Sequence, residues 1–301
     1  MNTGMRFRGH ETFFIRKGWI SKGIKAVERD PAVFVSKDMN PMDVLGIGSN
    51  MVMSLRYWLH ACGLTEEPAS GRKVQKFTAL GDAVRENDRY IEELGTLYLL
   101  QYRLATNKEM ATSWYYFFNE FQSQEFTRED FVSALQGYVV ANDCSVASRS
   151  LNDDFACIIN TYVPRYKTSP EKVSPENNID CPFGELGLID IVNKEKKQYR
   201  KAIPSPETFN PWVVLAVVMD QAGNASEVGL NNLLTDRCNI GRVFNLDVIT
   251  MIDVLRKAEK TGSIKIIRTA GLDVVRLDKH FSFEDCVNNY YKDIAGGSEH
   301  A

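Results

Sequence analysis

The chain has 301 residues, of which 44% are hydrophobic and 25% are charged, and its formal net charge is −3. This composition is typical of a folded globular protein, and it excludes a disordered or fibrous chain as well as a protein that is basic over its whole surface. The most apolar run, residues 212–219, is shorter than the roughly 20 residues that cross a bilayer, so we expect no membrane partner.

The sequence lacks several motifs that mark secreted, metal-binding or nucleotide-binding proteins. The N-terminus lacks the apolar stretch of a secretory signal, which predicts a cytoplasmic protein. The six cysteines are scattered without a CxxC pair, so neither a zinc ribbon nor a disulfide framework is expected. The sequence has no GxxxxGK[ST] loop and no GxGxxG fingerprint, and we therefore expect neither a nucleotide nor a flavin as cofactor.

Residues 6–23, RFRGHETFFIRKGWISKG, form the most unusual segment. Residues 1–30 carry seven basic against three acidic residues, so DNA binding by this acidic protein would be concentrated here. His10 and Glu11 are candidates for proton transfer, and Glu11 also for binding a divalent metal, Mg²⁺ or Mn²⁺. The cations suited to phosphate oxygens are Arg6, Arg8, Arg16, Lys17 and Lys22.

A structural role is the alternative for the same segment. His10, Glu11 and Arg16 would then form a hydrogen-bond network that ties the N-terminal arm to the unit that follows. The residues alone favour neither role over the other.

Residues 40–78 predict a winged helix. Asn40 and Pro41 are typical of a helix start, the stretch 45–48 ends this short helix, and Ser49 would cap a second helix that ends at Gly63. Residues 64–66 and 73–78 would pair as a basic wing. The outer face of the second helix would carry Asn50, Ser54, Arg56, Tyr57 and His60, and the wing would carry Arg72, Lys73 and Lys76. We expect these elements to contact DNA, although some winged helices contact only proteins.

A helical linking region follows. Helices are predicted over residues 94–106, 113–122, 128–142 and 151–163. Thr127 and Asp130 resemble a capping box for the third of these helices. Asp153 and Asp154 are interpreted as acids in the first turn of the fourth, where they would complement the helix dipole.

The segment 165–182 has the composition of a linker, with three prolines among polar residues. We place a domain boundary there, between an N-terminal domain of residues 1–164 and a C-terminal domain of residues 183–301. A hairpin over residues 183–203, turned at residues 193–197, would open the second domain.

The last part of the sequence predicts a second winged-helix-like module. Its elements would be a buried helix after Asn210, a polar helix near residues 227–234, an amphipathic helix over residues 246–260, and strands at residues 263–267 and 273–277. The amphipathic helix mixes acidic and basic residues, which favours contact with protein over contact with DNA. The predicted fold is therefore mainly α, with two winged-helix-like modules, a helical linking region and a small β-hairpin.

Residues 6–23, the helix pair LGIGSNMVMSLRYWLHACGL at residues 45–64 and the segment GTLYLLQYRLA at residues 95–105 resemble a bacterial family known as a domain of unknown function. Its members are similar to SspB, a component of DNA phosphorothioation operons. The likeness extends over most of the chain and is sharpest in residues 6–105. The motif positions that this sequence keeps are Arg6, Arg8, Gly9, His10, Glu11, Arg16, Gly18 and Trp19.

The resemblance implies a DNA-binding protein that nicks one strand, so that sulfur can replace a non-bridging phosphate oxygen in antiphage defence. The implied partners are DNA and the system's cysteine desulfurase, ATPase and sulfurtransferase. The resemblance assigns no catalytic residue. The roles of His10 and Glu11 as catalytic groups, and of Arg16 as a phosphate clamp, are a hypothesis from the chemistry of these residues. Two alternatives are open: a non-enzymatic adaptor that docks the sulfur-transfer machinery onto DNA, and a winged-helix transcriptional regulator.

Overall fold

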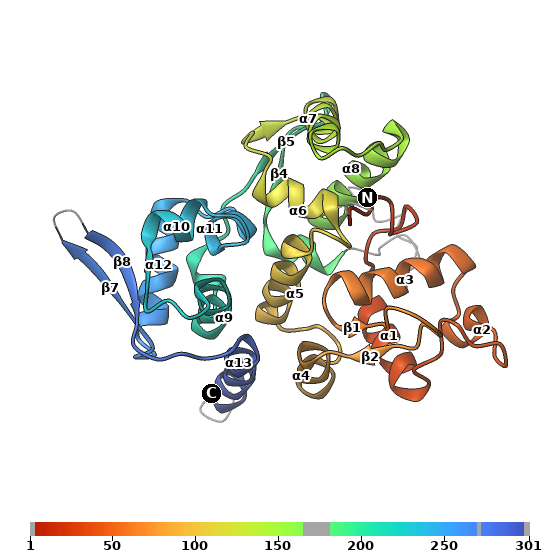
Figure 1. Cartoon of the computed structure of the whole chain (residues 1–301), viewed down its shortest axis with the longest axis horizontal. Coiled ribbons are helices and arrows are strands. Elements are labelled where there is room, and N and C mark those ends of the chain that lie inside the picture. Colours follow the sequence, from red (N-terminus) through yellow and green to blue (C-terminus); the bar gives the residue numbers. More distant parts are fainter. Residues whose placement is uncertain (1–3, 165–180, 270–271, 298–301) are drawn as a thin grey trace, which may run out of the picture.

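The structure of the chain, a computed structural model, describes residues 4–164, 181–269 and 272–297. It is mainly helical, as predicted, and the strands of the described residues form three small antiparallel sheets (Figure 1). Buried hydrophobic side chains from the N-terminal arm to the last helix belong to one core cluster.

The first unit is built from four helices and a short hairpin. Its elements are α1 (Trp19–Arg29), α2 (Pro41–Leu45), α3 (Ser49–Ala61), β1 (Thr65–Glu66), β2 (Lys76–Phe77) and α4 (Ala79–Asn87). Asn40 caps α2 as predicted, because its side chain accepts a hydrogen bond from the backbone of Met42. Ser49 does not cap α3: it is already the first helical residue, and Gly48 occupies the N-cap position.

A group of four helices forms the centre of the molecule. These are α5 (Leu94–Thr106), α6 (Thr112–Asn119), α7 (Arg128–Ala141) and α8 (Ser148–Tyr162), and the capping box of Thr127 and Asp130 is confirmed. Helix α6 is buried along its whole length because aromatic rings surround it; the ring of Phe117 packs edge to face on those of Phe118 and Phe126. Helices α5 and α8 pack against α6, and α7 packs on α8.

The predicted hairpin forms from β4 (Ile189–Asn193) and β5 (Gln198–Lys201). Strand β5 also pairs with β3 (Glu125–Phe126), which precedes α7, so the sheet order is β3-β5-β4. The hairpin is thus joined to the central helices. Most of the proposed linker, residues 165–180, lies outside the described residues.

The last unit surrounds α9 (Pro211–Ala222). Its other elements are β6 (Glu227–Gly229), α10 (Leu230–Thr235), α11 (Ile240–Val243), α12 (Val248–Glu259), β7 (Ile264–Thr269), β8 (Leu272–Leu277) and α13 (Phe283–Gly297). The prediction of a polar helix near residues 227–234 is wrong for residues 227–229. These residues form β6, which pairs with β8 in the sheet order β6-β8-β7. This pairing joins residues that are far apart in the sequence, so local helix propensity did not reveal it.

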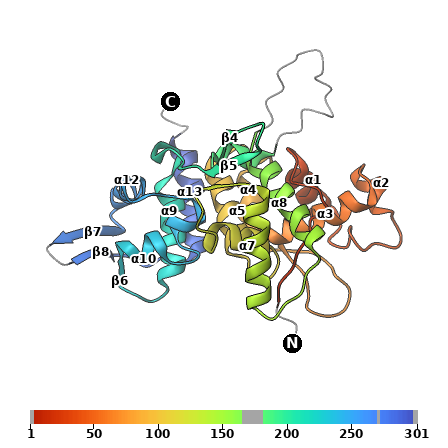
Figure 2. The same cartoon turned by 90° about the horizontal axis from the view of Figure 1, so that it is seen from above.

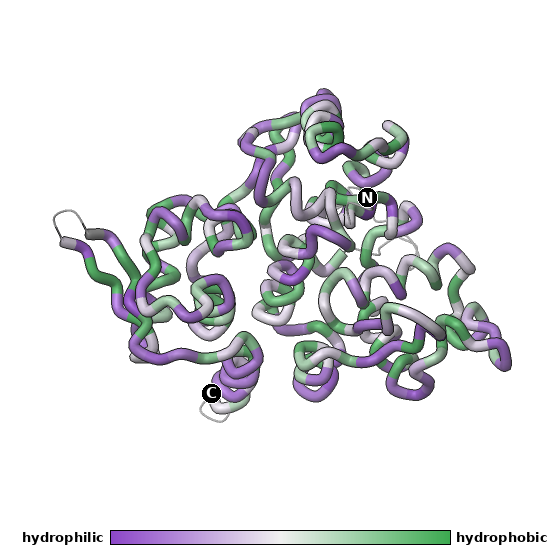
Figure 3. Tube along the Cα trace, viewed as in Figure 1, coloured by the Kyte–Doolittle hydropathy of each residue, from purple (hydrophilic) through white to green (hydrophobic). Residues whose placement is uncertain are grey.

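Helix α13 packs on α9 of the last unit and also on α4 of the first unit. The β7–β8 hairpin and α2 lie at opposite ends of the molecule (Figures 1 and 2). Hydrophobic and hydrophilic residues alternate along most of the helices (Figure 3). Within the described residues no helix has the length and apolar character needed to cross a membrane.

Candidate nucleic-acid interface

The N-terminal arm, residues 4–18, crosses α3 in an irregular conformation. Arg8, Glu11 and Thr12 have positive φ angles of 55°, 49° and 67°, a region that residues other than glycine rarely adopt. Such strained backbone persists only where the surrounding structure holds it, and it is often found at functional sites. The arm is therefore a fixed segment whose shape depends on its contacts.

His10 provides the central contact of the arm. Its imidazole is fully buried, and Nε2 lies 2.7 Å from Oδ1 of Asp154 on α8. Nδ1 accepts a hydrogen bond from the backbone N–H of Thr12 at 3.1 Å, which leaves Nε2–H to donate to the carboxylate. Asp154 also accepts hydrogen bonds from the backbone N–H of Arg8 and from the hydroxyl of Ser113 on α6.

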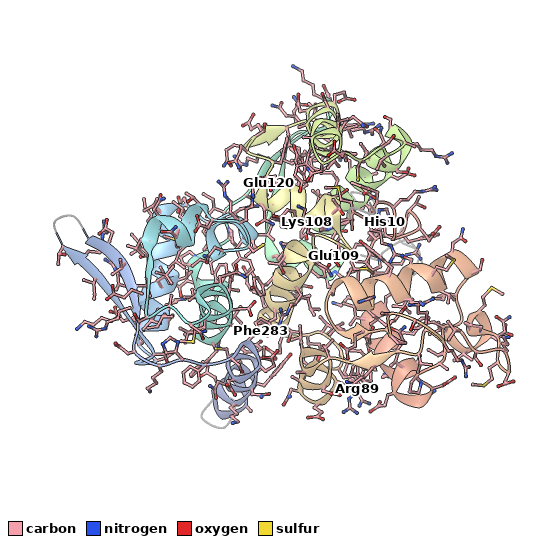
Figure 4. The ribbon with its side chains drawn as sticks, viewed as in Figure 1. His10, Arg89, Lys108, Glu109, Glu120 and Phe283 are labelled. Carbon is pink, nitrogen blue, oxygen red and sulfur yellow. The ribbon has the colours of Figure 1, made fainter. Side chains whose placement is uncertain are left out.

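This network joins the arm to α6 and α8. The position of His10 is marked in Figure 4. The arm is attached to α3 as well, because the carbonyl oxygen of Phe13 accepts hydrogen bonds from Ser54 at 3.2 Å and from the indole of Trp58 at 2.9 Å. Both ring nitrogens of His10 are engaged in the folded protein. The geometry is that of the structural alternative for His10, with α8 as its main partner.

Two expectations about side-chain position were wrong, each for a pair of residues. Ser54 and Tyr57 do not project from the outer face of α3; they are 0% and 4% exposed, because the arm covers that face. Asp153 and Asp154 do not lie in the first turn of α8, which begins at Ser148. Instead Asp153 pairs with Arg8 at 2.9 Å, and Asp154 is buried.

A hollow of about 450 Å³ lies between the arm, α3 and the segment that joins β1 to β2. We call it the arm hollow. Four of the charged residues predicted to act on DNA line it together, namely Arg6, Glu11, Arg56 and Lys73. Gly9, Met53, Tyr57, His60, Glu67 and Met110 also contribute to its wall.

Gly9 allows the arm to lie this close to α3. A Cβ atom at Gly9 would be only 2.5 Å from the ring of Tyr57 and 2.8 Å from Nε of Arg6. The guanidinium of Arg6 in turn lies over the ring of Tyr57, 5.2 Å from its centroid. The exposed Arg6 is thus held at the mouth of the hollow by a glycine and an aromatic ring.

The charges inside the arm hollow are partly compensated. Arg56 binds both oxygens of Glu67, at 2.6 and 2.7 Å, and Gln75 donates to the same carboxylate. Burial alone would raise the pKa of Glu67, but these hydrogen bonds outweigh it and lower the pKa. Burial lowers the pKa of His60, so its imidazole favours the neutral form, which can accept a proton.

The other predicted DNA contacts lie outside the arm hollow. Arg72 lines an adjoining shallow hollow of about 590 Å³ together with Lys73 and Lys37. Lys17 and Asn50 are exposed, and Arg16 lies over the rings of Phe13 and Trp19. Lys22 donates to the carbonyl oxygen of Leu45, and Lys76 pairs with Glu66.

Sequence reasoning missed Glu67 and Asp154 as partners of the functional residues. Both are acids whose role depends on a cation or a histidine from another element, so no local pattern marks them. His60 was expected to read a groove, whereas it lies half-buried in the wall of the arm hollow.

Within the described part of the chain, Glu11 has too few ligand partners beside it to form a metal site. No group of three or more His, Cys, Asp or Glu side chains suited to a metal ion occurs among the described residues. Glu67, the other carboxylate of the arm hollow, is engaged by Arg56 and Gln75. A resident cation would need more protein ligands than Glu11, so the arm hollow does not fit a dedicated metal site.

Comparison with known proteins identifies the family. The family described as "Protein of unknown function (DUF4007)" matches residues 7–291. Crystal structures of SspB and of magnesium ion-bound SspB resemble the chain, each with a TM-score of 0.81 and 25% identity over 96% of this chain and 88% of that one. None of the curated proteins matches the sequence. The chain therefore belongs to the DUF4007 family, as an SspB-like member.

Proposed function

We propose that this protein is the DNA-binding component of a DNA phosphorothioate modification and antiphage defence system. The observation that carries the proposal is the arm hollow, in which cations from the N-terminal motif and from α3 and the β1–β2 segment meet on a chain with the SspB fold. Such a group of cations suits the phosphate backbone of DNA. We infer the phosphorothioation system from the family resemblance, and with it a cysteine desulfurase, an ATPase and a sulfurtransferase as protein partners.

The DNA backbone would follow the cations that have no carboxylate partner within the described chain. Arg6 is exposed at the mouth of the arm hollow, Lys73 lines both hollows, and Arg72 extends the basic surface beyond it. Arg8, Arg56 and Lys76 already pair with acids, so their charge is less available to phosphate.

Nicking of one strand is the finer part of the proposal. We assign it to groups that line the arm hollow, because the buried His10 has no free ring nitrogen. Water would attack the phosphorus of one phosphodiester, and the P–O bond to one neighbouring sugar would break. His60 would accept a proton from the attacking water, Glu11 would orient that water, and Arg6 would stabilise the charge that develops on the phosphate, while the departing sugar oxygen takes a proton from solvent. Arg16, whose guanidinium lies on Phe13 and Trp19, stays a candidate phosphate contact outside the hollow.

Winged-helix architecture is also proposed. In residues 211–277 the order of helix, strand, three helices and hairpin, with the sheet order β6-β8-β7, supports such a module. In residues 41–78 the two strands pair over only two residues each, so support for the first module is limited to its helices and short hairpin.

DNA binding is tested by fluorescence anisotropy with a labelled duplex at several salt concentrations. Arg6→Ala should weaken binding and reduce the slope of log K against log salt by about one, because one phosphate contact is lost. Lys260→Ala, an exposed lysine at the end of α12, is the control and should leave the slope unchanged. Equal slopes for wild type and Arg6→Ala would contradict the proposed contact.

Nicking is tested by conversion of supercoiled plasmid to open circle, with magnesium, manganese or a chelator. Wild type should nick, whereas Glu11→Gln and His60→Asn should bind the plasmid and lose nicking. Circular dichroism checks that both variants fold. If wild type binds DNA but never nicks it, even with the partner proteins of the system present, the nickase assignment fails and the adaptor takes its place.

A further inference from the structure

A second hollow, of about 410 Å³, lies between the end of the β4–β5 hairpin, the end of α6 and the helices α11 and α12. We call it the hairpin hollow. The residues of its wall that matter here are Gln122, Lys201, Ile203, Arg242, Asp247 and Val248. None of them lines the arm hollow.

Lys201 and Arg242 bring two basic side chains to this hollow. The ammonium of Lys201 donates to the backbone carbonyls of Phe117 and Phe121, at 2.7 and 2.6 Å, at the end of α6. Arg242 donates to the carbonyl oxygen of Thr235 at 3.0 Å and to the side-chain oxygen of Gln122 at 2.7 Å. All of these acceptors are neutral.

The two basic groups therefore lack an acidic partner. Neither Lys201 nor Arg242 forms an ion pair with an acid in the part of the chain that the structure describes. Burial and the nearby Arg242 lower the pKa of Lys201 to about 7, as expected where one cation adjoins another without an acid between them. Both side chains also keep N–H groups beyond those used above, which are available to a further acceptor.

Asp247 is the one acid among the wall residues named above, and it is already engaged. Its carboxylate accepts a hydrogen bond from the backbone N–H of Thr250 at 2.8 Å, which caps α12. There it also complements the positive end of the helix dipole. Asp247 thus serves α12 and forms no ion pair with Lys201 or Arg242 in the described residues.

Large apolar side chains are exposed beside these cations. Ile203 and Val248, in the wall of the hairpin hollow, are 50% and 51% exposed. Ile249, the next residue of α12, is 72% exposed. Exposed apolar side chains beside an arginine are typical of surfaces that bind other proteins.

We propose that the hairpin hollow is a docking site for a segment of a partner protein that carries a carboxylate next to a large apolar side chain. The carboxylate would bind between Lys201 and Arg242, and the apolar side chain would cover Ile203 and Val248. A free anion would leave these apolar residues exposed, and a DNA backbone offers them no apolar surface. The inference is independent of DNA binding at the arm hollow, since the two hollows share no residue.

The test selects phage-displayed random peptides on the full chain and measures synthetic copies of the enriched peptides by calorimetry. Enriched peptides should contain Asp or Glu beside Leu, Ile or Phe. Arg242→Gln and Val248→Ser should each weaken their binding about tenfold, because each removes one of the two proposed contacts. The matched controls are Arg256→Gln, an exposed arginine on α12, and Ile191→Ser, an exposed apolar residue on β4; both should bind as wild type does.

Three results of the peptide experiment would overturn the proposal. The first is no enrichment, the second is enriched peptides without an acidic residue, and the third is binding that neither hollow variant weakens in folded protein.

A competition experiment with a short DNA duplex gives a further test. DNA should not displace the peptide from wild type; displacement that Arg242→Gln abolishes would instead assign the hollow to nucleic acid.

Discussion

The arm hollow and the hairpin hollow are similar in size, about 450 and 410 Å³, but their basic side chains have different partners. In the arm hollow Arg56 is neutralised by Glu67, and Arg6 is held on an aromatic ring. In the hairpin hollow Lys201 and Arg242 meet only neutral acceptors. Which cations are available to a ligand therefore depends on tertiary pairing, and the number of basic residues in a segment does not reveal it.

The same comparison divides the N-terminal basic segment. Arg8 is paired with Asp153, and its backbone N–H is bound by Asp154, so it belongs to the structural network. Arg6, two residues earlier, is exposed and faces the hollow. Neighbouring cations in one motif thus have separate tasks, one in positioning the arm and one at the surface.

The largest effect is expected from Asp154→Ala. This change leaves the buried His10, the hydroxyl of Ser113 and the backbone N–H of Arg8 without their acceptor. The free energy of unfolding should fall by about 3 kcal/mol, the usual cost of removing one partner from a buried charged network, as measured by urea denaturation.

Asp153→Ala is the matched control for that change. Its side chain is partly exposed and pairs with Arg8, so the loss should stay below about 1 kcal/mol. If both variants lost the same stability, the network around His10 would not hold the arm, and the structural account of His10 would be wrong.

A smaller loss is expected from Gly9→Ala. The added Cβ would lie 2.5 Å from the ring of Tyr57, so the arm must move away from α3 and the wall of the arm hollow must change. We expect about 1 to 3 kcal/mol of destabilisation and weaker DNA binding, measured by denaturation and anisotropy. Gly48→Ala, where a Cβ meets nothing within 4 Å, should leave DNA affinity unchanged. DNA affinity unaffected by Gly9→Ala would place the DNA elsewhere.

The subtlest effect is a change in pH dependence at the hairpin hollow. Burial lowers the pKa of Lys201 from 10.5 to about 7, so between these values the unfolded chain holds a proton that the folded chain has released. The stability that the neutral Lys201 contributes is fully present above the unfolded-state pKa of 10.5. It is lost as the pH falls toward the folded-state pKa of about 7. Lys201→Met should therefore make the free energy of unfolding rise less steeply with pH in this interval, in urea titrations at several pH values. Parallel profiles would show that Lys201 stays charged in the fold and is already compensated.

Much of the fold followed from local sequence signals. The limits of α5, the capping box of Thr127 and Asp130, and the start of α2 at Asn40 and Pro41 were all predicted, because each depends on residues within a few positions of one another. The β4–β5 hairpin was predicted for the same reason. Strand β6 was not, since it forms only by pairing with β8 from a distant part of the chain.

The candidate site divides in the same way. The sequence by itself determined which residue types cluster in the arm, and it led to the prediction that Arg6, Glu11, Arg56 and Lys73 act on DNA. Only the tertiary structure decided that these four share one hollow, that His10 is buried against Asp154, and that Lys201 and Arg242 meet across a second hollow. Charge pairing and burial are set by residues that lie far apart in the sequence, and they determine which polar groups are engaged within the fold and which are available to a ligand.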